Sequence, residues 1–382
     1  MWHKTRDEHL FDDGPKRILA LDGGGIRGAL TLGYLERIEG ILRERNGGDP
    51  DFRLCDYFDL IGGTSTGSII AAGLALGFAV DELVELYRSL GEKVFDKGML
   101  RFGLLGAKFP KEPLLRALDT HFGDITLGGD ELRTGLMVMT KRLDTGSPWL
   151  LHNNPRGKYF EGSGHDFPNR DMLLRNVVRA STAAPHYFEP ELLRIAPGVT
   201  GAFVDGGVSP YNNPALQMLM LATCSGYGLS WQFGADRLLL VSAGTGLRSL
   251  RMPAAEVMEM PAVLLAAQSM MSIMADANWQ GQAVLQWMAS SPTSWQIDSE
   301  VGDLRKDRIG GGPDLITYQR YEVALESKWL RENLDEHLDD AECDELYAMD
   351  NPKNLPRLAR LGTTAGAVQV QPDHFPAAFD LS

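Results

Sequence analysis

The chain is poor in cysteine and contains no long apolar run. Its 382 residues include only three cysteines, Cys55, Cys224 and Cys343, and no C-x-x-C pair, so neither a disulfide framework nor a zinc site is expected. No stretch of about 18 apolar residues occurs, so no membrane-spanning helix is predicted. Residues 1–15 are charged and lack the apolar centre of a secretory signal peptide. These absences favour a reducing, cytoplasmic compartment.

Basic residues are also outnumbered by acidic ones. The sequence has 37 Lys and Arg against 51 Asp and Glu, which gives a formal net charge of −14. Nucleic-acid binding depends on basic side chains that meet phosphates, so no nucleic-acid partner is expected. The same charge disfavours strong attraction of the whole molecule to anionic membranes, although a local basic patch could still act.

Strands alternate with helices between residue 16 and about residue 245, which predicts an α/β fold with a mostly parallel central sheet flanked by helices. We expect a polar lead-in over residues 1–15, one main domain over 16–320 and a helical extension over 321–382 packed on that domain. The expected strands are Lys16–Leu21, Tyr57–Ile61, Gly135–Lys141, Gly201–Asp205 and Arg237–Ser242, and the pattern after Tyr318 is interpreted as short helices.

Two apolar segments each allow two interpretations. Residues 97–113 interleave apolar and basic side chains among glycines, which fits either a loop packed on the core or a mobile flap beside a site. Seven of the 15 methionines fall between Met252 and Met288, where one or two long helices are expected. Because methionine adapts to varied apolar shapes, this region is interpreted either as an ordinary core or partner helix, or as a lipid-tail pocket or lid.

Three consecutive glycines, Gly23, Gly24 and Gly25, separate the first expected strand from a long helix. The free amides of such a turn, at a helix N-terminus, can hold a bound phosphate or an oxygen that becomes negative during a reaction. Residues 23–28 also match G-x-G-x-x-G, but the next strand has no acidic residue at its end to hold a ribose. The dinucleotide interpretation therefore lacks its confirming residue, and no Gly-Lys-Ser/Thr follows that would make a P-loop.

The second strand leads into Gly63-Thr64-Ser65-Thr66-Gly67 and then into an apolar helix. This is the pattern of a nucleophile elbow, in which the serine projects from a sharp strand-to-helix turn and small residues flank it. A serine nucleophile needs a base, and in an α/β-hydrolase that base is a histidine that follows an acidic residue in the chain. After Asp205, the best acidic candidate, only His337 and His374 remain, and neither comes after a strand. Asp205 ends an expected strand and is followed by two glycines, so it is a candidate base, although Asp-Gly is also a common turn.

Four motifs occur in a characteristic order: residues 22–28, residues 63–67, residues 180–188 and Asp205-Gly206-Gly207. Together they resemble the patatin-like phospholipases, in particular bacterial patatin-like acyl hydrolases. The resemblance runs from about residue 16 to residue 250. It implies a three-layer fold with a mostly parallel sheet.

The resemblance also implies a Ser-Asp dyad, with Ser65 as the nucleophile and Asp205 as the base. It makes the amides of Gly24 and Gly25, with Gly23 alongside, the oxyanion hole. Gly63 and Gly67 then belong to the nucleophile elbow. Arg27 either steadies the glycine loop or faces a lipid phosphate, and His186 is either a neighbour of the chemistry or a surface residue. No metal or organic cofactor is implied.

The expected function is hydrolysis of fatty-acyl esters in membrane phospholipids. The substrate would be a phospholipid or another acyl lipid, reached through peripheral contact at the inner membrane face, and homo-oligomerisation is left open. Three alternatives remain: the same chemistry in an effector switched on by a second messenger, a catalytically inert lipid-binding protein, and a nucleotide-binding oxidoreductase.

Overall fold

The computed structural model describes residues 3–94, 109–162, 167–249 and 251–381. Most of the apolar and basic 97–113 segment lies outside these ranges. Within them, nine strands form one sheet in the order β5-β6-β3-β2-β1-β7-β9-β8, and β4 pairs with β3. The strands are β1 Lys16–Leu21, β2 Leu60–Thr64, β3 Gly135–Arg142, β4 Ser147–His152, β5 Glu191–Ala196, β6 Val199–Asp205, β7 Leu238–Ala243, β8 Ala289–Ser290 and β9 Ile316–Tyr321.

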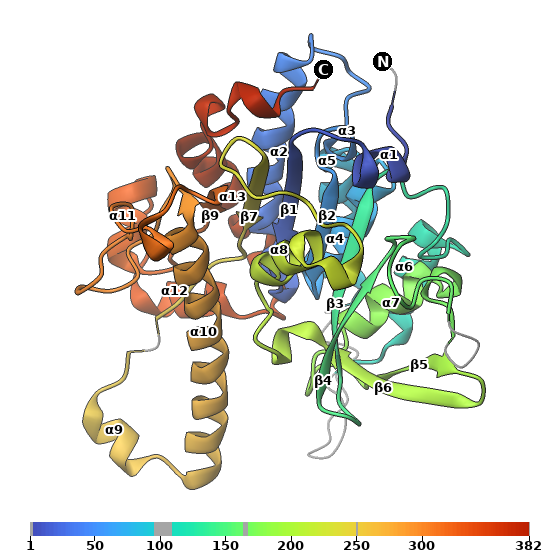
Figure 1. The fold of residues 1–382 in the computed structure, drawn as a ribbon. Coiled ribbons are helices and arrows are strands. Elements are labelled where there is room, and N and C mark those ends of the chain that lie inside the picture. The colour runs from blue at the N-terminus through green and yellow to red at the C-terminus, as the bar shows by residue number, and fades with distance from the viewer. Residues whose placement is uncertain (1–2, 95–108, 163–166, 250, 382) are drawn as a thin grey trace.

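Helices cover both faces of this sheet (Figure 1). They are α1 Arg6–Phe11, α2 Gly28–Arg45, α3 Leu54–Tyr57, α4 Thr66–Ala75, α5 Val80–Val94, α6 Glu112–Phe122, α7 Leu174–Ser181, α8 Ala215–Thr223, α9 Ala254–Glu259, α10 Ala262–Met288, α11 Ser327–Leu334, α12 Asp340–Tyr347 and α13 Leu355–Gln369. None of the helices in the described ranges is both long enough and apolar enough to cross a bilayer.

The side chains of β1 show why the fold has three layers. Leu19 and Leu21 point into one apolar core, shared with α2 and α4, whereas Ile18 and Ala20 point into a second core, shared with α8. Successive side chains of a strand point to opposite faces, and both faces here are apolar, so β1 is buried between two helical layers. The mostly parallel sheet expected from the sequence is confirmed, with β1 paired in parallel to both β2 and β7.

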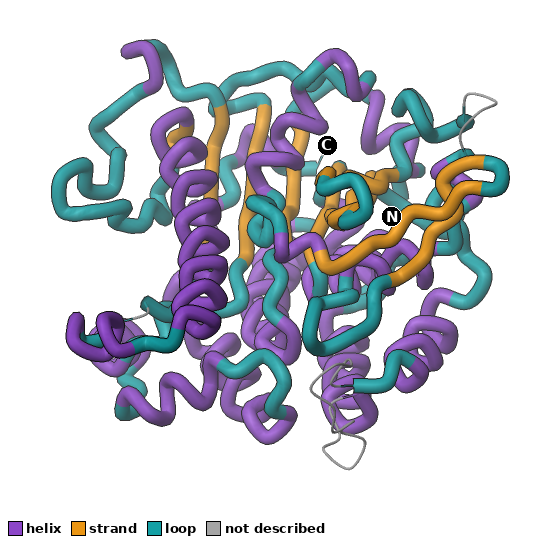
Figure 2. Tube along the Cα trace, turned by 90° about the horizontal axis from the view of Figure 1, so that it is seen from below, coloured by secondary structure: helices purple, strands orange, loops and turns teal. Residues whose placement is uncertain are grey.

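Two expected boundaries were wrong. The second strand begins at Leu60 rather than Tyr57, because residues Leu54–Tyr57 form the short helix α3. Its buried apolar residues give this segment a pattern that is also typical of a strand. Tyr318 lies inside β9, a buried strand between β7 and β8, rather than at the start of a helical region. Strands β4, β5 and β8 were not expected. Figure 2, seen from below the view of Figure 1, shows strands of the sheet (orange) side by side, with helices (purple) around them.

Helices α2 and α13 pack unusually closely because glycines meet at their crossing. A Cβ on Gly33 would lie 2.1 Å from the carbonyl carbon of Gly362, and a Cβ on Gly362 would lie 2.3 Å from the carbonyl oxygen of Leu30. The C-terminal helix is therefore fitted against the helix that follows the glycine loop, at a distance that only glycine permits.

We predict that Gly33→Ala lowers the free energy of unfolding by about 1–3 kcal/mol, because the added methyl group has no space at the helix crossing. Gly40→Ala on the same helix is the matched control, since no atom lies within 4 Å of its Cβ position. That control should stabilise the protein by roughly 0.5–1 kcal/mol. Urea midpoints measure both, and equal shifts in the two variants would contradict the close packing.

Candidate active site

Ser65 lies on a strained turn between β2 and α4. Its backbone has φ 54° and ψ −123°, an unusual conformation for a residue with a side chain. The turn brings three backbone segments together: a Cβ on Gly63 would lie 2.2 Å from the carbonyl carbon of Gly67, and a Cβ on Gly67 would lie 2.3 Å from the carbonyl oxygen of Leu21. Both glycines of the G-x-S-x-G pattern are thus required sterically. The N-terminus of α4 follows Ser65 directly, where its dipole favours negative charge.

Asp205 lies at the end of β6 and faces Ser65. The Ser65 Oγ donates a hydrogen bond to Asp205 Oδ2 at 2.5 Å, and the Gly207 amide donates to Oδ1 at 2.7 Å. Burial raises the pKa of Asp205 to about 6, although its two hydrogen bonds and the charge of Arg179 oppose the shift. The sequence pattern and the structure therefore single out the same hydroxyl and carboxylate, which are 140 residues apart in the chain.

The C-terminal end of α7 and the residues that follow it hold both Ser65 and Asp205 in place. The Ser65 amide donates to Ser181 Oγ at 2.9 Å, and Ser181 in turn donates to the Met139 carbonyl at 2.7 Å. The Asp205 amide donates to the Ala183 carbonyl at 3.0 Å. The 180–188 motif was expected near the site, but the contact of Ser181 with Ser65 was missed, because nothing in a sequence indicates which backbone amide a serine hydroxyl meets.

The glycine loop lies beside Ser65. Gly24 and Gly25 line the same cavity as Ser65, and within the described residues their amides make no hydrogen bond. The Gly23 amide, in contrast, donates to the Asn212 carbonyl at 3.1 Å, so it is not available to a ligand. Of the three glycine amides expected to form the oxyanion hole, those of Gly24 and Gly25 therefore remain as candidate donors. Gly25 has φ 59°, which favours glycine at that position.

Arg27 is buried behind this loop and is not among the described residues that line the cavity. Its guanidinium donates to the carbonyls of Gly246 at 2.8 Å and Gly24 at 3.3 Å, and lies 4.1 Å from the ring centroid of Tyr347. Of the two roles left open for Arg27, these contacts favour steadying the loop.

A buried ion network anchors the start of the loop. Arg320, on β9, donates to both carboxylate oxygens of Asp22 at 2.9 and 2.6 Å, and to Glu322 at 2.6 Å. Burial raises the pKa of Asp22 and of Glu322, and the charge of Arg320 opposes both shifts. Burial alone would lower the pKa of Arg320, but the two carboxylates hold it above its ordinary value. Glu322 also accepts the Gly246 amide at 2.7 Å, which connects the network to Arg27.

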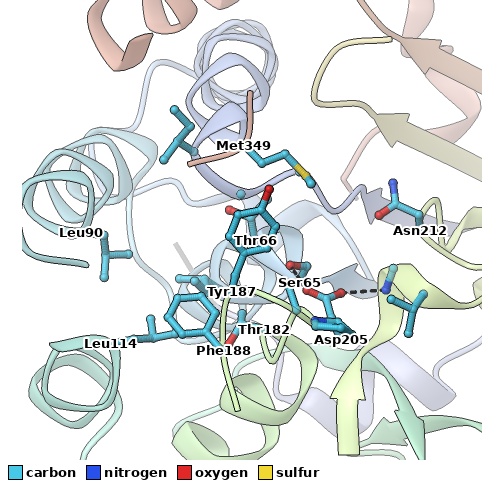
Figure 3. A pocket seen from close by; sticks show the side chains of 18 of the residues that line it. Ser65, Thr66, Leu90, Leu114, Thr182, Tyr187, Phe188, Asp205, Asn212 and Met349 are labelled. Atoms are coloured by element: carbon cyan, nitrogen blue, oxygen red, sulfur yellow. Dashed lines mark hydrogen bonds between the residues drawn. The ribbon is translucent and has the colours of Figure 1, made fainter. Parts of the chain in front are cut away.

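The cavity above Ser65 is mainly apolar and has a volume of about 220 Å³. Figure 3 shows Ser65 and Asp205 at its base and the side chains of Leu90, Leu114 and Phe188 around it. The other described residues that line it are Gly24, Gly25, Ile26, Thr66, Ile69, Tyr87, Gly91, Thr182, Ala184, Pro185, Tyr187, Gly207, Val208, Asn212, Met274, Met349 and Leu355. Such a space suits the alkyl chain of a ligand whose polar group reaches Ser65 and Asp205.

The structure also shows where His186 and the methionine-rich region lie relative to the cavity. His186 is exposed, has φ 74° and does not line the cavity, although its neighbours Pro185 and Tyr187 do. The methionine-rich region forms α9 and α10, and its Met274 lines the cavity. No group of three His, Cys, Asp or Glu in the described ranges is arranged to hold a metal ion. The site can therefore be described as a hydroxyl, a carboxylate and two free amides at the base of an apolar cavity.

Comparison with known proteins places these features in a family. Residues 19–219 match the family model described as patatin-like phospholipase. A cGAMP-activated phospholipase of Vibrio cholerae is 33% identical over 218 residues, which cover 54% of this chain and 57% of that protein. Patatin group J-1 of Solanum tuberosum is 29% identical over 248 residues, 61% of each chain. The matched region thus spans less than two thirds of the length of these relatives.

A solved structure, that of VipD from Legionella pneumophila, aligns with 91% of this chain and 67% of its own length, at 13% identity and a TM-score of 0.40. A similarity this low supports no conclusion about fold or function.

We predict that Arg320→Met lowers the free energy of unfolding by about 3–5 kcal/mol, because it leaves two buried carboxylates without their cation. Arg331→Met is the control: Arg331 is exposed on α11, and its loss should change stability by no more than about 0.5 kcal/mol. Chemical unfolding of the two variants provides the measurement. If both unfold at the wild-type midpoint, the network does not support the fold.

Proposed function

This chain belongs to the patatin-like phospholipase family, and on that premise we propose that it is a lipid acyl hydrolase that cleaves fatty-acyl esters of phospholipids. The observation that carries the proposal is the hydrogen bond of 2.5 Å between the Ser65 hydroxyl and the buried Asp205 carboxylate. It lies at the base of an apolar cavity beside the unpaired amides of Gly24 and Gly25.

In the proposed mechanism, Ser65 is the nucleophile and Asp205 is the general base. Asp205 Oδ2 accepts the hydroxyl proton as Ser65 Oγ attacks the ester carbonyl carbon. The Gly24 and Gly25 amides donate to the oxygen that becomes negative, and each such donor stabilises the transition state by about 3–4 kcal/mol. The lysophospholipid or glycerol alcohol leaves with that proton. Water, activated by Asp205, then attacks the acyl-enzyme and releases the fatty acid.

The environment of each group supports its role. A carboxylate is an effective base when its pKa is near the working pH, and burial raises the pKa of Asp205 to about 6. Arg27 acts as a positioning residue in this proposal, because it holds the Gly24 carbonyl rather than a ligand.

A second candidate function is the same hydrolysis under the control of a second messenger. The relatives of this chain in Vibrio cholerae and Escherichia coli are named cGAMP-activated phospholipases, each 33% identical to it in the matched region. Fatty-acid release from vesicles, measured with and without cGAMP, separates a constitutive hydrolase from a gated one.

We predict that Ser65→Ala abolishes fatty-acid release, and that Asp205→Asn lowers its rate by at least about a hundredfold, because the base is lost. Both variants should keep the fold, and Ser65→Ala should also fail to react with a fluorophosphonate probe. Ser225→Ala and Asp236→Asn, at exposed positions, are the matched controls and should retain full activity. Full activity in either site variant would disprove the dyad. Absence of probe labelling in the wild-type protein would indicate an inert lipid-binding protein.

The pH dependence should follow the carboxylate of Asp205. Only its ionised form can accept the Ser65 proton, so kcat/KM for a soluble ester should fall as the pH falls through about 6. Stopped assays in overlapping buffers between pH 4.5 and 8 provide the profile. A rate that stays constant across this interval would show that Asp205 does not titrate as the base.

A further inference from the structure

The methionine-rich region, expected to be either a core helix or a lipid-facing element, is exposed. Residues 252–275, which we call the hairpin, comprise α9 and the first half of α10 and extend from the body of the fold (Figure 1). Its most exposed large apolar side chains are Met258 at 85%, Val263 at 81%, Ile273 at 66% and Leu264 at 59%. Large apolar surfaces of this kind mark an interaction site when they are contiguous.

The apolar residues surround the helix rather than forming one stripe. Val263, Leu264 and Leu265 are consecutive, so their side chains are about 100° apart around the helix axis. Ile273 occupies the remaining sector, and residues 262–275 contain no charged side chain. The polar residues of this segment are the uncharged Gln268, Ser269 and Ser272. A helix with exposed apolar side chains on every side suits an environment that surrounds it, whereas a second copy of the chain or another protein surface would cover a single face.

The charge of the hairpin indicates which lipid surface it suits. It carries Glu256 and Glu259 but no Lys or Arg, so it offers no attraction to anionic headgroups. Association would therefore depend on burial of apolar side chains in a neutral surface.

The hairpin is also continuous with the proposed active site. Met274, on the same helix, lines the cavity that contains Ser65. It lies about 18 Å along the helix axis from Ala262, at a rise of about 1.5 Å per residue.

We propose that the hairpin is a docking element that inserts its apolar tip into a neutral phospholipid surface and so presents the cavity to its substrate. The proposal rests on the proposed function for the identity of the substrate. The binding step itself requires only the exposed apolar side chains.

Co-sedimentation with phosphatidylcholine vesicles tests the binding step. The wild-type protein should sediment with the vesicles equally well at 0.1 M and about 1 M NaCl, since screening does not weaken apolar burial. Met258→Glu and Val263→Glu, combined, should lower the partition coefficient at least tenfold. The control is Leu192→Glu, at a leucine 65% exposed on β5 at the other end of the sheet, which should bind as the wild type does.

Parallel assays keep this proposal separate from the proposed function. Ser65→Ala should bind vesicles normally, and the hairpin variant should hydrolyse a soluble short-chain ester at the wild-type rate while it loses activity on vesicles. If the wild type binds vesicles but cleaves no ester, the docking proposal stands and the proposed function fails.

Three results would overturn the docking proposal. The first is a wild-type protein that does not sediment with neutral vesicles, and the second is a hairpin variant that sediments like the wild type. The third is a wild-type dimer that the hairpin substitutions convert to a monomer in size-exclusion chromatography, because the surface would then bind a second copy of the chain.

Discussion

The geometry of the glycine loop depends on one buried ion pair. Asp22 directly follows β1 and Arg320 lies on β9, and their paired hydrogen bonds fix the point at which the loop leaves β1. Glu322 extends the same network to Gly246, to which Arg27 is also bonded. The network thus fixes both the start of the loop and the Gly246 contact behind it, while Gly24 and Gly25 line the cavity.

The proposed site therefore combines rigidly held polar groups, Ser65 and Asp205, with a cavity whose apolar lining can adapt its shape. The backbone amides of Ser65 and Asp205 are held by the Ser181 hydroxyl at the end of α7 and by the Ala183 carbonyl just after it. Above them, leucine, phenylalanine and methionine side chains line the space, and Met274 connects it to the exposed hairpin. Precise placement is confined to the reacting groups, while the surfaces that would meet alkyl chains can accept varied shapes.

Much of this arrangement could be predicted from the sequence. The continuous apolar run before the glycines predicted β1 with its observed bounds, and the ordered motifs identified the family. The strand β9 was missed because Gln319 and Arg320 are polar, although both are buried. Arg320 is paired in the ion network, and Gln319 bonds the Thr293 hydroxyl and the His374 carbonyl. The amide of Gly23 and the hydroxyl of Ser181 have tertiary partners that no local pattern specifies. The division of the chain at residues 15 and 320 stays a prediction.

The distance along the chain between Asp22 and Arg320 has a consequence for biosynthesis. The two residues are 298 positions apart, so at about 5–20 residues per second a ribosome needs roughly 15–60 seconds between them. In the last part of that interval, once Asp205 has been made, the serine, the aspartate and the glycines are all present, but Arg320, the cation that fixes the loop, has not been made. A nascent chain consequently acquires its complete loop anchor only once Arg320 has been made, well after the residues of the proposed site themselves.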